Sequence, residues 1–418
     1  MDAPAVAQSP SGAVVTAPRA VRVARRAAGG LPRAFWVLWA GTLVNRLGTF
    51  VEPFLALYLT GSRHLSLAEA GTVLAAYGAG SVPSQLIGGS LSDRIGRRAT
   101  LTAGMLANAA ALLLLGYASG MAALAAASAF AGLTIDMYRP ASSALVADLA
   151  GSRDRTRAYG LLFWAMNVGY SVAMVTGGTL ARRGFTPLFW ADAVTCAAFG
   201  LLVWRAVPET RPAAAPAGAD RARGGFAAVL GDPVMVAFTL LTVLTMCVFM
   251  QAFTTLPLAM TRGGLSPQSY GLAMAANGLV IVAAQPLTGA WLGRRDPAAV
   301  LAGGVAAMGL GFGLMSLASA TWQYAACVAV WTVGEIFFSS VGPAVVAALA
   351  PPELRGRYSG LFGLAFSLGY LVAPLAGTRL LAHGRPVLWL SCAGACAVAA
   401  AGQLALGPAI RRREGVAG

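Results

Sequence analysis

Twelve long apolar stretches constrain the fold of this chain more than any other feature of its sequence. A membrane-spanning helix needs about 20 predominantly apolar residues. Inside lipid every backbone hydrogen bond must be satisfied internally, and apolar stretches of this length favour helices. The stretches cover residues 35–60, 68–91, 100–118, 121–149, 156–180, 187–205, 234–260, 268–292, 298–318, 322–349, 357–381 and 386–407. We therefore expect an all-α integral membrane protein with twelve transmembrane helices.

The charge content supports a lipid-facing surface. Charged residues make up 11% of the chain, against about a quarter in soluble proteins. The thirty basic residues, all of them arginine, outnumber the fifteen acidic ones. They fall in short clusters between apolar stretches and form no stripe on one domain, which argues against a nucleic-acid partner and for a lipid bilayer.

The arginine clusters also predict orientation. The rich loops are residues 19–33, 94–98, 153–157, 205–223, 294–295, 355–357 and 411–413. The alternate loops hold only Arg63, Arg182, Arg183, Arg262 and Arg385. Arginine-rich loops stay in the cytoplasm, so we expect a multi-pass protein of the bacterial inner (plasma) membrane with both termini cytoplasmic.

Polar segments divide the chain into two halves. Residues 1–33 are rich in Ala, Pro, Ser and Arg and lack the apolar core of a signal peptide, which predicts a disordered basic cytoplasmic tail. The Pro-, Ala- and Gly-rich segment 206–233 is typical of a flexible cytoplasmic linker. We expect six helices in residues 34–205, six in residues 234–408, and a short cytoplasmic tail at 409–418.

The two halves repeat at an offset of 200 residues. Leu149, Arg155, Arg157, Gly160, Gly169, Tyr170 and Gly177 recur as Leu349, Arg355, Arg357, Gly360, Gly369, Tyr370 and Gly377. Apolar bias alone does not align arginines, glycines and tyrosines without a gap. Six spans in each repeat give both halves the same orientation, so we expect pseudo-symmetric halves around a central cavity.

The loop between the second and third spans carries the clearest motif. Residues 88–98 read GGSLSDRIGRR and resemble the G-x-x-x-D-R-x-G-R-R/K signature of the major facilitator superfamily. A degenerate copy at 289–295 lacks the acid. The resemblance, which covers about residues 34–408, implies an alternating-access transporter. The gating residues that we expect in and near this loop are Gly89, Asp93, Arg94, Gly96, Arg97 and Asp148.

These loop charges have two interpretations. Asp93 can pair with a neighbouring arginine or sit at a helix N-terminus, and Asp148 is a second possible partner for Arg94 or Arg97. Such a charge latch would favour one of two access states. The alternative is a solvated loop that only sets topology, which we favour for Arg98. For Asp93 and Arg94 we favour the latch.

A weaker pattern concerns the direction of transport. The fifth span keeps the glycine spacing of the pattern found in drug:proton antiporters, but Met174 replaces its proline. The eleventh span has the proline, as Pro374. The resemblance to the twelve-span drug:proton antiporter group implies export, whereas small residues that let helices approach closely are the alternative explanation.

Charges inside the predicted spans are functional candidates because they are costly in lipid. Glu52, Asp136 and Glu335 are candidates to carry the transported proton, with Arg46 and Arg139 beside them. We expect Arg46 and Asp136 to form an ion pair, with Arg139 as a competing partner. A static pair that only stabilises packing is the alternative.

Two further charges, Asp192 and Arg379, lie nearer the outer ends of their spans. We expect them to reach the interface by snorkelling.

Polar and aromatic residues of the spans are candidates to contact substrate in the central cavity. They are Asn45, Tyr77, Tyr138, Trp164, Asn167, Gln251 and Asn277. Hydrogen bonding between helices is the alternative for each of them.

These observations predict a secondary active transporter of a small molecule by alternating access, with proton-coupled efflux of drug-like or amphipathic compounds as the favoured function. An importer or exporter of sugars, organic acids or peptides is the alternative, since fold does not fix substrate. We expect no enzyme activity, because the chain has no HExxH, nucleophile elbow or Walker loop. We expect a monomer without cofactor or metal, driven by a proton gradient. The five cysteines lie in apolar stretches as packing residues.

Overall fold

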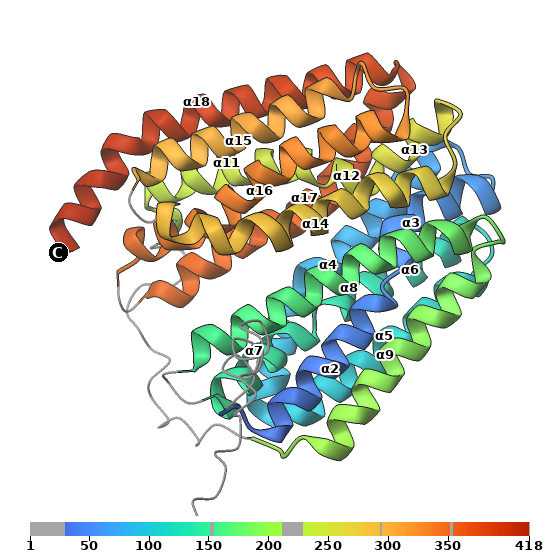
Figure 1. The fold of residues 1–418 in the computed structure, drawn as a ribbon, viewed down its shortest axis with the longest axis horizontal. Coiled ribbons are helices and arrows are strands. Elements are labelled where there is room, and N and C mark those ends of the chain that lie inside the picture. The colour runs from blue at the N-terminus through green and yellow to red at the C-terminus, as the bar shows by residue number, and fades with distance from the viewer. Residues whose placement is uncertain (1–29, 151–153, 211–228, 293–294, 352–353, 418) are drawn as a thin grey trace, which may run out of the picture.

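Residues 30–150, 154–210, 229–292, 295–351 and 354–417 are described by the computed structural model of this chain. Every regular element among them is a helix, and nine of these helices are long and apolar enough to cross a membrane. The helices form two bundles (Figure 1). The predicted all-α membrane fold is confirmed. Most of the predicted tail at 1–33 and of the predicted linker at 206–233 lies outside the described residues.

The first bundle contains the first six predicted spans. Its elements are α2 (Arg33–Leu47), α3 (Val51–Leu57), the π-helical turn η1 (Tyr58–Ser62), α4 (Leu67–Ile95), α5 (Arg97–Tyr117), α6 (Met121–Ile135), α7 (Tyr138–Leu149), α8 (Arg155–Ala181) and α9 (Thr186–Ala206). Two of the spans are discontinuous. The first breaks between α2 and α3, and the fourth breaks between α6 and α7 at Asp136. Pro53 and Pro140 lie just after these breaks, where they cost no helical hydrogen bond.

The second bundle repeats this arrangement. Its elements are α11 (Pro233–Phe249), α12 (Gln251–Thr254), α13 (Leu256–Arg262), α14 (Pro267–Leu292), α15 (Pro297–Leu314), α16 (Thr321–Leu349), α17 (Arg355–Ala382) and α18 (Arg385–Ala417). The bounds of α4 and α14, and of α8 and α17, differ by about 200 residues, as the sequence repeat requires. Residues 409–417, expected as a tail, extend α18.

The C-terminal end of α18 is tied to the start of α11 through Asp232. This carboxylate accepts hydrogen bonds from the backbone N–H of Val234, from the Tyr358 hydroxyl at 2.8 Å and from Arg413 at 2.9 Å. Burial opposes ionisation of Asp232, but the bonds from Arg413 and Tyr358 outweigh it and hold its pKa below the usual value for an aspartate. The last turns of α18 are therefore anchored to the bundle.

The two halves meet along two helix pairs related by the repeat, α4 with α17 and α8 with α14. A Cβ atom added at Gly78 would lie 2.4 Å from the backbone of Tyr370, and one added at Gly278 would lie 2.9 Å from the backbone oxygen of Asn167. Glycine at both positions lets the helix backbones approach across the interface.

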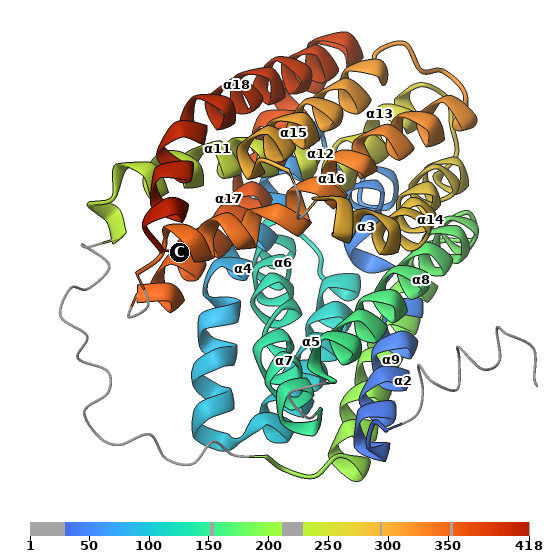
Figure 2. The ribbon, with the colours of Figure 1, turned by 60° about the vertical axis from the view of Figure 1, so that its left-hand side comes forward.

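The contacts between halves extend to the arginine-poor end of the molecule. There Arg182 donates to Gln268 at 2.8 Å, and the rings of Phe54 and Tyr270 pack edge to face at 5.4 Å. Four ion pairs at the arginine-rich end each lie within one half: Arg97–Asp148, Arg98–Glu209, Arg413–Asp232 and Arg411–Asp296. The bundles accordingly diverge toward the end that carries the C-terminus (Figures 1 and 2). The structure is closed at the arginine-poor end and open at the arginine-rich end.

Candidate functional site

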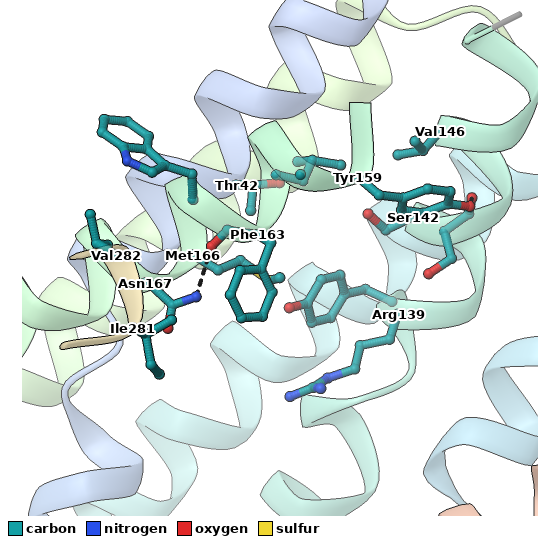
Figure 3. A pocket seen from close by; sticks show the side chains of 15 residues that line it. Thr42, Arg139, Ser142, Val146, Tyr159, Phe163, Met166, Asn167, Ile281 and Val282 are labelled. Atoms are coloured by element: carbon teal, nitrogen blue, oxygen red, sulfur yellow. Dashed lines mark hydrogen bonds between the residues drawn. The ribbon is translucent and has the colours of Figure 1, made fainter. Parts of the chain in front are cut away.

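A cavity of about 640 Å³ lies between the halves in the arginine-rich part of the molecule. Its walls come from α2, α7, α8 and α14 (Figure 3). They are mainly apolar and aromatic, with Tyr159, Phe163 and Met166 on α8 and Ile281 on α14. A cavity of this size and character is suited to a drug-sized molecule.

Three of the seven predicted substrate-contacting residues line this cavity. Tyr138 lies on α7, and Trp164 and Asn167 lie on α8. The Trp164 ring is stacked on Trp39 with 6.4 Å between centroids. The Asn167 amide donates to the Phe163 carbonyl at 2.9 Å.

The other four lie in helix contacts. Asn45 donates to the Cys196 sulfur at 3.2 Å, and Gln251 donates to the Ala373 carbonyl at 3.0 Å. Tyr77 is buried, with its ring centroid 6.3 Å from that of Tyr370. The amide of Asn277 donates to Glu335. For these four residues the observed contacts match the helix-packing alternative.

The predicted ion pair between Arg46 and Asp136 is wrong for this conformation. Asp136 instead pairs with Arg139, with 2.5 Å between Oδ1 and Nε, and Arg46 donates to the Tyr138 hydroxyl. The prediction assumed a continuous fourth span over residues 121–149, but the break places Asp136 at the C-cap of α6, one turn before Arg139. A neighbour three residues away then reaches the carboxylate first.

Glu52 makes a contact that joins the two halves. The Tyr370 hydroxyl on α17 donates to the Glu52 carboxylate on α3 at 2.5 Å. The repeat-related Tyr170 packs edge to face against Phe253 at 6.4 Å. The same tyrosine position therefore meets an acid in one half and a phenyl ring in the other. Sequence reasoning found Tyr370 as a repeat residue but gave it no partner.

Glu335 lies within the second half. The Asn277 amide donates to its Oε2 at 2.6 Å and to the Thr332 hydroxyl at 3.0 Å. These bonds link α14 to α16. The acid therefore has a neutral partner, unlike Asp136.

Asp192 does not snorkel. Its residue is only 5% exposed, and its carboxylate accepts hydrogen bonds from the backbone N–H of Phe50 at 3.1 Å and of Val51 at 3.0 Å. These donors are freed by the break in the first span, and a carboxylate is favourable at the start of a helix. Asp192 thus stabilises the break, whereas Arg379 is exposed as expected.

One of the ion pairs that the sequence allowed is present near the charged loop between α4 and α5. Arg97 pairs with Asp148, as the sequence allowed, but this pair joins α5 to α7 within one half. Gly96 has φ of +100°, a conformation that favours glycine in this tight turn. Within the described part of the chain no ion pair is formed by Asp93 or Arg94, and both are exposed. At Gly89 an added Cβ would meet nothing within 4 Å.

Arg98 is not simply solvated, contrary to expectation. Its guanidinium lies over the Trp204 ring at 4.7 Å and 3.8 Å from the Glu209 carboxylate. Glu209 also accepts from the backbone N–H groups of Arg98 and Ala99, each at 3.0 Å. This acid, which the sequence analysis placed in the linker, caps the start of α5.

Asp93→Asn should reduce transport while leaving the thermal stability of the purified protein unchanged. Asp93 has no ion pair within the described residues, so its charge is expected to act in the conformation that closes the arginine-rich end. A difference of a few kcal/mol between conformations suffices for such an effect. Melting temperature and transport rate are measured together, with Asp148→Asn as the matched variant of a paired acid. Normal transport by Asp93→Asn would contradict a latch.

Comparisons with known proteins agree with this architecture. Residues 38–266 and 253–416 match the family described as Major Facilitator Superfamily. The uncharacterized MFS-type transporter YqjV of Bacillus subtilis is 26% identical, over 84% of this chain and 88% of that protein. Multidrug resistance protein MdtH of Aeromonas hydrophila is 26% identical, over 85% of this chain and 90% of that protein. A crystal structure of the peptide transporter POT in complex with sulfate superposes with a TM-score of 0.75 at 18% identity, over 91% and 96% of the two chains.

Proposed function

The chain belongs to the major facilitator superfamily and is a secondary transporter of small molecules, and we propose that it exports drug-like or amphipathic compounds in exchange for protons. The observation that carries this proposal is the cavity of about 640 Å³ with aromatic and apolar walls, which lies in the arginine-rich part of the molecule. We take that end as cytoplasmic, because arginine-rich loops are retained there. The similarity to a multidrug resistance protein over most of both chains supports the same function.

Exchange for protons requires an acid whose protonation affects the conformational equilibrium. Of the three candidates, Glu52 has the contact best suited to this, because its hydrogen bond to Tyr370 joins the halves at the closed end. Asp136 and Glu335 make their described contacts within one half. We therefore propose Glu52 as the coupling acid. Two cavity-lining residues contact charged neighbours: Arg139 pairs with Asp136, and the Tyr138 hydroxyl accepts a hydrogen bond from Arg46.

The proposal is tested by transport into inverted membrane vesicles. A panel of amphipathic compounds, sugars, organic acids and peptides is presented with and without an imposed proton gradient. Amphipathic compounds should accumulate, and dissipating the gradient should remove the accumulation. Accumulation of only sugars or peptides would favour the alternative substrates. Uptake by intact cells without efflux would favour an importer. The sequence allows this alternative, because Met174 replaces the proline of the antiporter pattern in the fifth span.

A further inference from the structure

The charge exposed on the cavity wall is positive. Among the described lining residues, Arg139 is the only one with a formal charge. Its side chain is 54% exposed, against 16% for its partner Asp136. The carboxylates of Glu52 and Glu335 are engaged by Tyr370 and Asn277. A molecule that enters the cavity therefore meets a guanidinium before it meets any of these acids.

The contact with Asp136 uses one edge of this guanidinium. Asp136 lies against Nε at 2.5 Å, and within the described part of the chain Nη1 and Nη2 have no hydrogen-bond partner. Figure 3 shows the Arg139 side chain extended, with its guanidinium end apart from the other labelled side chains. The two terminal nitrogens present parallel N–H donors, a geometry that matches the two oxygens of a carboxylate, sulfonate or phosphate.

Aromatic side chains line the same cavity as Arg139. Tyr138 precedes Arg139 on α7, and Phe163 and Trp164 face the same cavity from α8. Such rings provide broad apolar contact for the body of a ligand. A cationic ligand would be repelled by Arg139, and a neutral one would leave its donors unpaired in a largely apolar cavity.

We propose that Arg139 anchors the acidic group of an amphipathic anion, whose apolar body packs against the aromatic walls of this cavity. The assignment rests on the proposed function in taking the cavity as the substrate path, and it narrows the substrate class to compounds that carry one carboxylate, sulfonate or phosphate group. Asp136 holds the Nε edge and orients the side chain. Its negative charge also opposes the bound anion, so its removal strengthens binding.

A matched ligand series tests the charge preference directly. Naphthaleneacetate, naphthaleneethanol and naphthalenemethylamine share one apolar body and differ in charge. Their binding to the purified protein in lipid nanodiscs is measured by thermophoresis. The anion should bind at least about tenfold more tightly than the alcohol, because a hydrogen bond to a charged group contributes that much. The amine should bind most weakly. Equal affinities, or tightest binding of the amine, would overturn the proposal.

Three variants locate the preference. Arg139→Gln should remove the advantage of the anion, and Arg139→Lys should keep part of it because the charge remains without the paired donors. Asp136→Asn should increase anion affinity. Arg379→Gln, which removes an exposed arginine of α17, serves as the control and should change nothing. Retention of the preference in Arg139→Gln would overturn the assignment.

This experiment separates the inference from the proposed function. Binding in nanodiscs requires neither export nor a proton gradient. If the anion binds through Arg139 but no compound accumulates in vesicles, efflux is wrong and the binding site stands. If cations and anions accumulate equally, export stands and the anion site is wrong.

Discussion

Glu52→Gln should reduce gradient-driven transport at least about tenfold while exchange of substrate across the membrane continues. The Glu52 carboxylate accepts a hydrogen bond from the Tyr370 hydroxyl at 2.5 Å, and this bond joins α3 in one half to α17 in the other. A neutral amide cannot bind or release a proton, so the contact no longer depends on the gradient. A hydrogen bond to a charged group contributes about 1.5–3 kcal/mol, enough to change the ratio of the two conformations by about tenfold or more.

The measurement compares proton-driven accumulation with counterflow in the same vesicles. Accumulation by Glu52→Gln should fall at least about tenfold, and counterflow should persist. Tyr370→Phe, which removes the donor, should weaken coupling in the same direction. Tyr170→Phe is the matched control, because this repeat-related tyrosine packs against Phe253 and not against an acid. Normal accumulation by Glu52→Gln would move the coupling site to Asp136 or Glu335.

The spans were predictable because apolar stretches of this length are typical of membrane-spanning helices. The breaks within the first and fourth spans were not predicted. At the first break Asp192, on α9, accepts the two freed N–H groups of Phe50 and Val51. That stabilisation comes from a helix more than 140 residues away, so apolar length and local residue preferences did not reveal it. The same limitation made Asp192 look like a residue at the membrane interface.

The sequence identified residues of the candidate site better than it identified their contacts. Their position inside predicted spans identified Asp136, Arg139 and Glu52, because charged residues are rare there. It did not give the rotation of each helix, so Arg46 was assigned to Asp136 when the Tyr138 hydroxyl accepts its hydrogen bond. The contact between Glu52 and Tyr370 spans 318 positions and depends on how the halves meet.

Glycines of α4 and α6 permit close helix contacts of two kinds, one between the halves and one within a half. Gly78 and Gly278 occupy matched positions of the 200-residue repeat. In the structure, an added Cβ there would lie 2.4 Å from the carbonyl of Tyr370 and 2.5 Å from the backbone nitrogen of Leu371, in the other half. At Gly132 on α6 an added Cβ would lie 1.9 Å from the Tyr77 carbonyl oxygen, within the same half. Backbone atoms cannot rotate away as side chains do.

Gly78→Val should therefore shift the protein away from the conformation that is open at the arginine-rich end, without unfolding it. The halves must separate at the closed end, whereas the packing inside each half is untouched. Overpacking costs about 1–3 kcal/mol, which corresponds to a shift of about 5- to 150-fold between conformations. Gly132→Val should instead reduce the amount of folded protein, because its clash lies inside one bundle.

Thiol labelling distinguishes these outcomes. Ser143 lines the cavity, so Ser143→Cys in inverted vesicles should react rapidly with an impermeant maleimide. Adding Gly78→Val should slow the reaction, by at most the factor of the conformational shift. Gly89→Val is the control on the same helix, since a Cβ there meets nothing within 4 Å. Four of the five native cysteines are buried, and the protein without Ser143→Cys gives the background. Rapid labelling and normal transport in Gly78→Val would mean that the close approach of α4 and α17 does not control access to the cavity.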